Sequence, residues 1–153
     1  NHTSYVVEYT PHDDCLSHEV YEHQISWPKP SDQTTLSELH GYAQRELSAT
    51  DVSLDFSRDV IQSLRCPKCG HARDVYACAG TVTVDQAKCP VDSEEMEVTT
   101  IHGFSGKESY GHRTVGTVGL PPYDVFVARS KGREMQILME ADRATVLAGL
   151  DDK

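Results

Sequence analysis

Closely spaced cysteines are the strongest chemical signal in this sequence. Cys66 and Cys69 are separated by two residues and followed by Gly70. Two thiolates at this spacing can bind one metal ion from a tight turn, a zinc knuckle. The backbone amides of the turn can hydrogen-bond the sulfurs, and Gly70 permits a positive φ there. The pattern therefore predicts half of a zinc site.

A second turn of the same form follows at Cys89-Pro90-Val91-Asp92, with Asp92 where a fourth cysteine would stand. A carboxylate oxygen can bind zinc, so Cys66, Cys69, Cys89 and Asp92 make a plausible tetrahedral set. Cys78 is the competing fourth ligand and would give an all-sulfur site. His71 and His102 are weaker candidates, because neither lies at a knuckle position. The alternative is a ribbon that has lost its metal.

The predicted cofactor is structural Zn²⁺, and no catalytic residue is assigned. A catalytic zinc keeps three protein ligands and an open position for water. Three thiolates would make the ion a poor Lewis acid, and the second knuckle favours a closed site.

A separate group of reactive side chains lies near the N-terminus. Cys15 and His18, two residues apart, are half of a possible second metal site, which His12 or His23 would extend. They also fit a nucleophile–base pair, since an imidazole lowers the pKa of a nearby thiol. That alternative predicts a small thiol or zinc-dependent enzyme. The third interpretation is a polar loop between two strands.

Hydrophobic periodicity predicts an α+β fold, mainly antiparallel, with one clear helix and an inserted zinc-ribbon hairpin. Thr35 and Glu38 form a capping-box pattern, and Leu36, Leu39, Ala43 and Leu47 follow at helical spacing. Residues 1–65 and 105–153 are predicted to form the α+β domain, and residues 66–104 the zinc-ribbon subdomain. Alternation or β-branched residues predict strands at 4–9, 20–27, 52–56, 60–64, 97–101, 125–128 and 134–139, and a hairpin of 75–78 with 81–84.

Composition limits the partners. The formal charge is −10, from 24 acidic and 14 basic residues, which argues against binding to nucleic acid. No apolar stretch is long enough to span a membrane, and no signal-peptide pattern is seen. Five cysteines without an export signal fit reduced thiols and metal binding, so a cytoplasmic location is expected.

Four short motifs follow one another along the chain: Cys15-x-x-His18, Thr34-Thr35-Leu36, Cys66-Pro67-Lys68-Cys69-Gly70 and Gly119-Leu120-Pro121-Pro122-Tyr123-Asp124-Val125. Their order resembles the region that follows the adenylating domain in bacterial ThiF-like proteins, relatives of the ubiquitin-activating enzymes. The resemblance implies a non-catalytic accessory module that docks a ubiquitin-like or sulfur-carrier protein, and an edge of the strands at 125–139 is a candidate for pairing with it. Asp92 and His18 depart from the pattern, since a cysteine is expected at each.

Overall fold

The structure, a computed structural model, describes residues 23–148. Most of its regular structure is β-strand, with one helix of three turns. The elements are β1 (Gln24–Ser26), α1 (Leu36–Glu46), β2 (Ser53–Arg65), β3 (Ala72–Cys78), β4 (Glu97–Phe104), β5 (Val125–Ser130), β6 (Arg133–Leu138) and α2 (Arg143–Val146), with 3-10 turns η1 (Ala79–Thr81), η2 (Ser109–His112) and η3 (Gly116–Val118).

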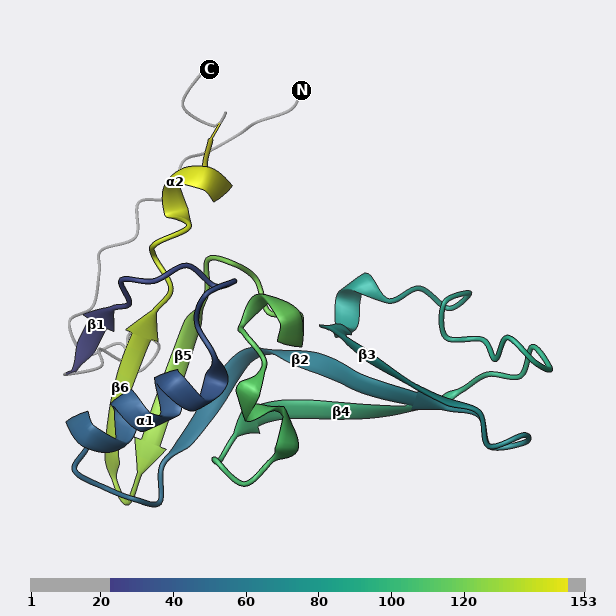
Figure 1. Cartoon of the computed structure of the whole chain (residues 1–153), viewed down its shortest axis with the longest axis horizontal. Helices are drawn as coiled ribbons and strands as arrows, with labels where there is room; N and C mark the ends of the chain where they lie inside the picture. The colour runs from purple at the N-terminus through teal and green to yellow at the C-terminus, as the bar shows by residue number, and fades with distance from the viewer. Residues whose placement is uncertain (1–22, 149–153) are drawn as a thin grey trace, which may run out of the picture.

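The strands form one six-stranded sheet in the order β1-β6-β5-β2-β3, with β4 paired to β2 outside this path. Only β1 and β6 are parallel, and every other pair in the sheet is antiparallel. Helix α1 lies across one face of this sheet (Figure 1). The predicted α+β class with mainly antiparallel pairing is therefore confirmed.

Helix α1 begins where the sequence predicts. The Thr35 side chain accepts a hydrogen bond from the Glu38 amide at 3.2 Å, which satisfies one of the free N–H groups of the first turn. The Glu38 carboxylate pairs with Lys29. The apolar stripe faces the sheet and is buried, with Leu36, Leu39 and Ala43 fully inaccessible and Leu47 nearly so.

Strand β2 is longer than the sequence suggests, because the two strands predicted at 52–56 and 60–64 are one. Ser53 to Asp55 pair with β5, and the strand continues to Arg65 between β3 and β4. Over one stretch, β2 has more residues than the β4 segment that it pairs with, and a bulge in β2 accommodates them. β2 advances from Asp55 to Val60 while β4 moves only from Gly103 to Ile101. The irregular stretch between the two alternating runs explains why they read as separate strands.

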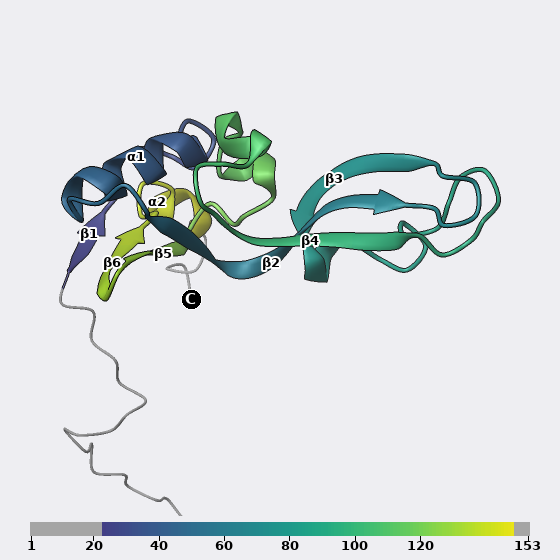
Figure 2. The ribbon, with the colours of Figure 1, turned by 90° about the horizontal axis from the view of Figure 1, so that it is seen from below.

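Strand β2 connects two parts of the molecule, visible in Figures 1 and 2. We call the part around α1, β1, β5 and β6 the body, and the projecting part formed by β3, β4, the far half of β2 and residues 66–71 and 79–96 the arm. Each has its own buried cluster. The body cluster is Trp27, Leu36, Leu39, Ala43, Leu47, Val52, Leu54, Val60, Phe104, Tyr110, Val115, Val118, Leu120, Phe126, Ala128, Met135, Ile137 and Met139, and the arm cluster is Ile61, Leu64, Cys66, Cys89 and Met96.

Two expectations about strand pairing are wrong. The predicted hairpin of 75–78 with 81–84 does not form: residues 75–78 lie in β3, but Ala79–Thr81 is a 3-10 turn and β3 pairs with β2. The first cysteine turn supplies the hairpin, because it joins β2 directly to β3. The strands at 125–139 also offer little free edge, since β5 lies between β2 and β6, and β1 pairs with Gln136–Leu138. The strand predicted at 4–9 lies outside the described residues.

Candidate metal centre

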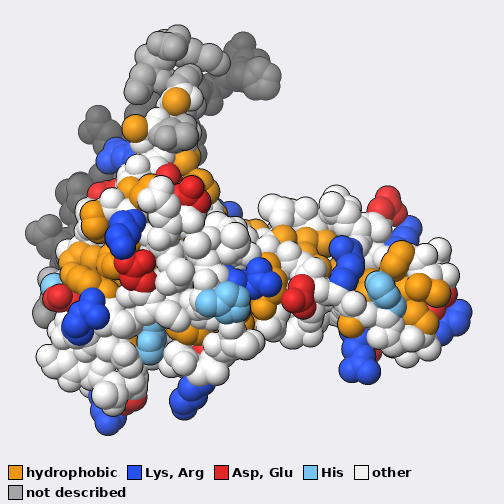
Figure 3. Space-filling model, in the orientation of Figure 1, with side chains coloured by type: hydrophobic (Ala, Val, Ile, Leu, Met, Phe, Trp, Pro, Cys, Tyr) orange, Lys and Arg blue, Asp and Glu red, His pale blue; other side chains and the backbone are white. Residues whose placement is uncertain are grey.

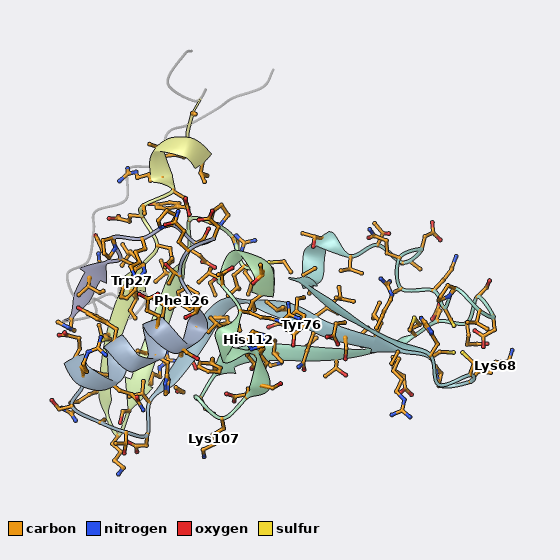
Figure 4. The ribbon with its side chains drawn as sticks, in the orientation of Figure 1. Trp27, Lys68, Tyr76, Lys107, His112 and Phe126 are labelled. Carbon is orange, nitrogen blue, oxygen red and sulfur yellow. The ribbon has the colours of Figure 1, made fainter. Side chains whose placement is uncertain are left out.

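Four side chains that the sequence singles out converge at the outer end of the arm. The ligand atoms of Cys66, Cys69, Cys89 and Asp92 all lie within 4.8 Å of one another. Cys66 and Cys69 belong to the turn between β2 and β3, whereas Cys89 and Asp92 belong to the loop that precedes β4. Figure 4 shows sulfur atoms gathered at this end, beside the labelled Lys68.

The two turns make the same backbone hydrogen bonds. The Cys66 amide donates to the His71 carbonyl at 2.7 Å, and the Cys89 amide donates to the Glu94 carbonyl at 2.8 Å. Each turn is thus closed by a bond from its first cysteine to the residue five positions later. The two cysteine turns therefore share the same backbone hydrogen bond.

The correspondence continues inside the turns. Gly70 donates its amide to the Cys66 carbonyl at 3.0 Å, and Ser93 donates to the Cys89 carbonyl at 2.9 Å. Gly70 and Ser93 both have positive φ, 76° and 60°. Asp92 therefore occupies in the second turn the place that Cys69 occupies in the first.

Backbone amides also point at the sulfurs. The Cys69 amide donates to Cys66 Sγ, and the Val91 amide donates to Cys89 Sγ, each at 3.5 Å. The bond from Cys69 is the largest contribution that lowers the pKa of Cys66, because it stabilises the thiolate. Both turns are arranged to hold ionised sulfur.

The spacing of the donors fits a tetrahedral zinc ion. With Zn–S near 2.3 Å and Zn–O near 2.0 Å, a tetrahedron has S···S edges of about 3.8 Å and S···O edges of about 3.5 Å. The Cys69 and Cys89 sulfurs are 3.5 Å apart, and Cys66 Sγ is 3.6 Å from each carboxylate oxygen of Asp92. Three sulfurs and one oxygen form a donor set that zinc accepts.

The charges at this end favour a bound cation. Hydrogen bonding from Cys89 lowers the pKa of Asp92, and the Glu94 amide adds a bond at 3.2 Å. For Cys69, the His71 backbone lowers the pKa, but desolvation, the neighbouring Cys66 and Cys89 and the negative Asp92 outweigh it and raise the pKa to about 11. If all four donors were ionised they would repel one another, and a divalent cation bound between them would remove that repulsion.

The inner half of the cluster belongs to the arm's hydrophobic core. Cys66 is fully buried and Cys89 is 3% exposed, and both pack with Ile61, Leu64 and Met96. Cys69 is exposed and Asp92 is half-buried. The candidate site is therefore continuous with the packing that holds the loop before β4 against the strands.

The competing fourth ligand lies elsewhere. Cys78 pairs with Val60, at the opposite end of β3 from the cysteine turn, about 20 Å away at the rise of a β-strand. Its thiol donates to the Gly119 carbonyl at 2.8 Å. Among the described residues, Asp92 rather than Cys78 is the fourth donor within reach of the three cysteines.

The candidate histidines that the structure describes do not join the cluster. His71 contributes its carbonyl, and the His102 ring pairs with Asp59 at 2.7 Å on the exposed side of β4. His23 lies 3.8 Å from Glu46. His12, Cys15 and His18 lie outside the described residues, so the structure places neither the second metal site nor the nucleophile–base pair.

Sequence reasoning missed the residues that support the ligands. Ser93 and Glu94 repeat the backbone roles of Gly70 and His71, which aligning the two cysteine turns residue by residue would have suggested. Met96 closes the arm cluster beneath the second turn. No local pattern marks it, because its partners Ile61 and Leu64 are far away in the sequence.

In the part of the chain that the structure describes, no helix is long and apolar enough to cross a membrane. We compared the chain with models of protein families, with curated proteins and with solved structures, and nothing matched in any of the three comparisons.

Proposed function

We propose that this chain is a non-catalytic protein-interaction module whose arm is stabilised by a structural zinc ion bound to Cys66, Cys69, Cys89 and Asp92. The observation that carries the proposal is the convergence of these four donors from two turns of the same backbone geometry.

A structural role agrees better with the donor set than a catalytic one. Four protein donors complete a tetrahedral shell and leave no position for water or substrate. Three thiolates and a carboxylate also carry more negative charge than Zn²⁺ neutralises, so the ion would be a weak Lewis acid. Hydrogen bonds from the backbone amides of Cys69 and Val91 hold the sulfur atoms of Cys66 and Cys89 in place.

The arm needs such support because its own core is small. Among the described residues, the arm cluster has five buried members, two of which are the candidate ligands Cys66 and Cys89, and only partly buried residues such as Val82 and Ala87 of the loop pack against it. A cluster of this size buries too little apolar surface to fix a long loop alone. A zinc ion would link the turn that ends β2 to the segment that begins β4.

The interaction role is supported by the shape and surface of the arm. It projects from the body (Figure 2), and Val84 and Val91 on it are 69% and 70% exposed. Figure 3 shows hydrophobic side chains at its outer end, among charged ones. Together with the resemblance to ThiF-like proteins, this favours a ubiquitin-like or sulfur-carrier protein as the partner.

Metal content per chain, measured by mass spectrometry on protein purified without added metal or chelator, tests the site. We expect one zinc per chain in the wild type and in Asp85→Ala, which removes an exposed aspartate from the same loop. We expect loss or marked weakening in Asp92→Ala. A wild-type chain without metal would refute the proposal, and retention by Asp92→Ala would remove Asp92 from the ligand set.

The partner is tested separately, by NMR titration of the labelled chain with a purified ubiquitin-like sulfur-carrier protein. Shifts concentrated on residues of the arm are expected. Zinc binding without such shifts would keep the metal site and refute this choice of partner.

A further inference from the structure

One long edge of the sheet is free. Strand β4 pairs with β2 along its length, from Glu97 opposite Arg65 to Phe104 opposite Leu54. Among the described residues, Glu97 to His102 make no backbone hydrogen bond outside this ladder. The free edge ends at Gly103, whose carbonyl accepts a bond from the Tyr110 hydroxyl at 2.7 Å. β4 thus presents a row of unpaired donors and acceptors.

The other edges of the sheet are shorter or interrupted. β1 has three residues. β3 is broken at Tyr76, which has a φ of 49° and carries Arg113 stacked over its ring at 3.7 Å. A Cβ added at Gly119 would lie 2.5 Å from the Tyr76 carbonyl oxygen, so the segment at η3 closely covers this end of β3.

β4 lacks the features that natural proteins use to block edge pairing. Its sequence, Glu97 to Phe104, contains no lysine and no proline, and four of its residues are β-branched. Val98 is 50% exposed, and Thr99 and Thr100 are exposed. Such a strand suits an antiparallel partner, since β-branched cross-strand pairs stabilise a sheet.

We propose that two copies of this chain pair through β4, antiparallel across a two-fold axis between Val98 and Thr100. In a two-fold pair, β4 of one copy contacts β4 of the other. Like charges on this strand must therefore not lie opposite each other. Glu97 is the only acid on β4 and lies at its end. With the axis at Val98, Thr99 or Thr100, Glu97 lies opposite Thr99, Ile101 or Gly103 of the second copy, so the two Glu97 residues never lie directly opposite each other.

Long-range charge gives this pairing a distinctive salt dependence. Each copy carries a formal charge of −10, so two copies repel each other at low ionic strength. Salt screens this repulsion, whereas the strand contacts are uncharged. Association of two copies should therefore strengthen as salt is added, the reverse of what a basic partner strand would show.

Sedimentation velocity of the full chain, over a dilution series at low and high salt, tests the proposal. We expect a concentration-dependent dimer that tightens with salt. Val98→Lys should raise the dissociation constant about tenfold or more, because it places a lysine on each paired edge. Val146→Lys makes the same change at an exposed position in α2, outside the arm, and should leave association unchanged.

A second variant, Thr100→Lys, covers the case in which Val98→Lys disturbs the arm, and far-UV circular dichroism verifies the fold of each variant. Hydrogen exchange should show β4 amides gaining protection as the protein concentration rises. A chain that stays monomeric under all conditions, or a dimer insensitive to both β4 lysines, would overturn the proposal. Pairing with only a foreign basic strand would overturn it as well.

Discussion

At the scale of single residues, the candidate site depends on Asp92 acting as a fourth ligand in place of a cysteine. Its position matches that of Cys69, because Ser93 and Gly70 beside them share positive φ and the same hydrogen bond back to a cysteine carbonyl. The backbone of the second turn is therefore already shaped for a cysteine at position 92. Only the atom offered to the metal differs.

This equivalence predicts that Asp92→Cys gives a tighter zinc site than the wild type. A thiolate is a softer and stronger donor for zinc than a carboxylate, so the affinity should rise about tenfold or more. Competition with a zinc chelator of known affinity measures the change. The isosteric Asp92→Asn, which removes the charge, should weaken binding. Equal affinity in all three proteins would mean that residue 92 is not a ligand.

At the scale of elements, the sequence predicts an element correctly when the residues that determine it lie close together in the chain. Helix α1 is predictable because its cap at Thr35 and its apolar stripe lie within one segment. The single long β2 is not, because its bulge depends on pairing with β4, about forty residues later. The hairpin prediction failed for a related reason. β3 pairs with β2, and the cysteine turn reverses the chain between them. The sequence analysis interpreted this turn only as a possible metal site.

The cap of α1 provides a test at this scale. Thr35→Ala removes the acceptor for the Glu38 amide and should lower the free energy of unfolding by about 1 kcal/mol. Thr35→Ser keeps the hydroxyl and should retain most of the stability. Urea unfolding followed by circular dichroism measures both. If the two variants are equally destabilised, the hydroxyl's bond is not the source of the stability.

At the scale of the whole molecule, one continuous sheet joins two unequal cores. The body cluster contains eighteen buried residues and the arm cluster five, and β2 belongs to both. Buried apolar surface increases with the number of buried residues. We therefore expect the body to bury enough to stay folded alone, and the arm to bury too little. The order of the arm is then expected to depend on the proposed metal, and the order of α1 and the strands beneath it to be independent of it.

Removal of zinc should therefore loosen the arm while the body remains folded. Hydrogen exchange, measured with and without a chelator, should show amides of β3 and the residues 86–96 losing protection, because the metal no longer joins the two cysteine turns. Amides of α1, β5 and β6 should keep theirs, since these elements pack around the body cluster and contribute none of the four proposed ligands. Restoring zinc should restore the pattern. Complete unfolding would show that the body depends on the arm, and unchanged exchange in β3 would show that the small arm cluster suffices without a metal.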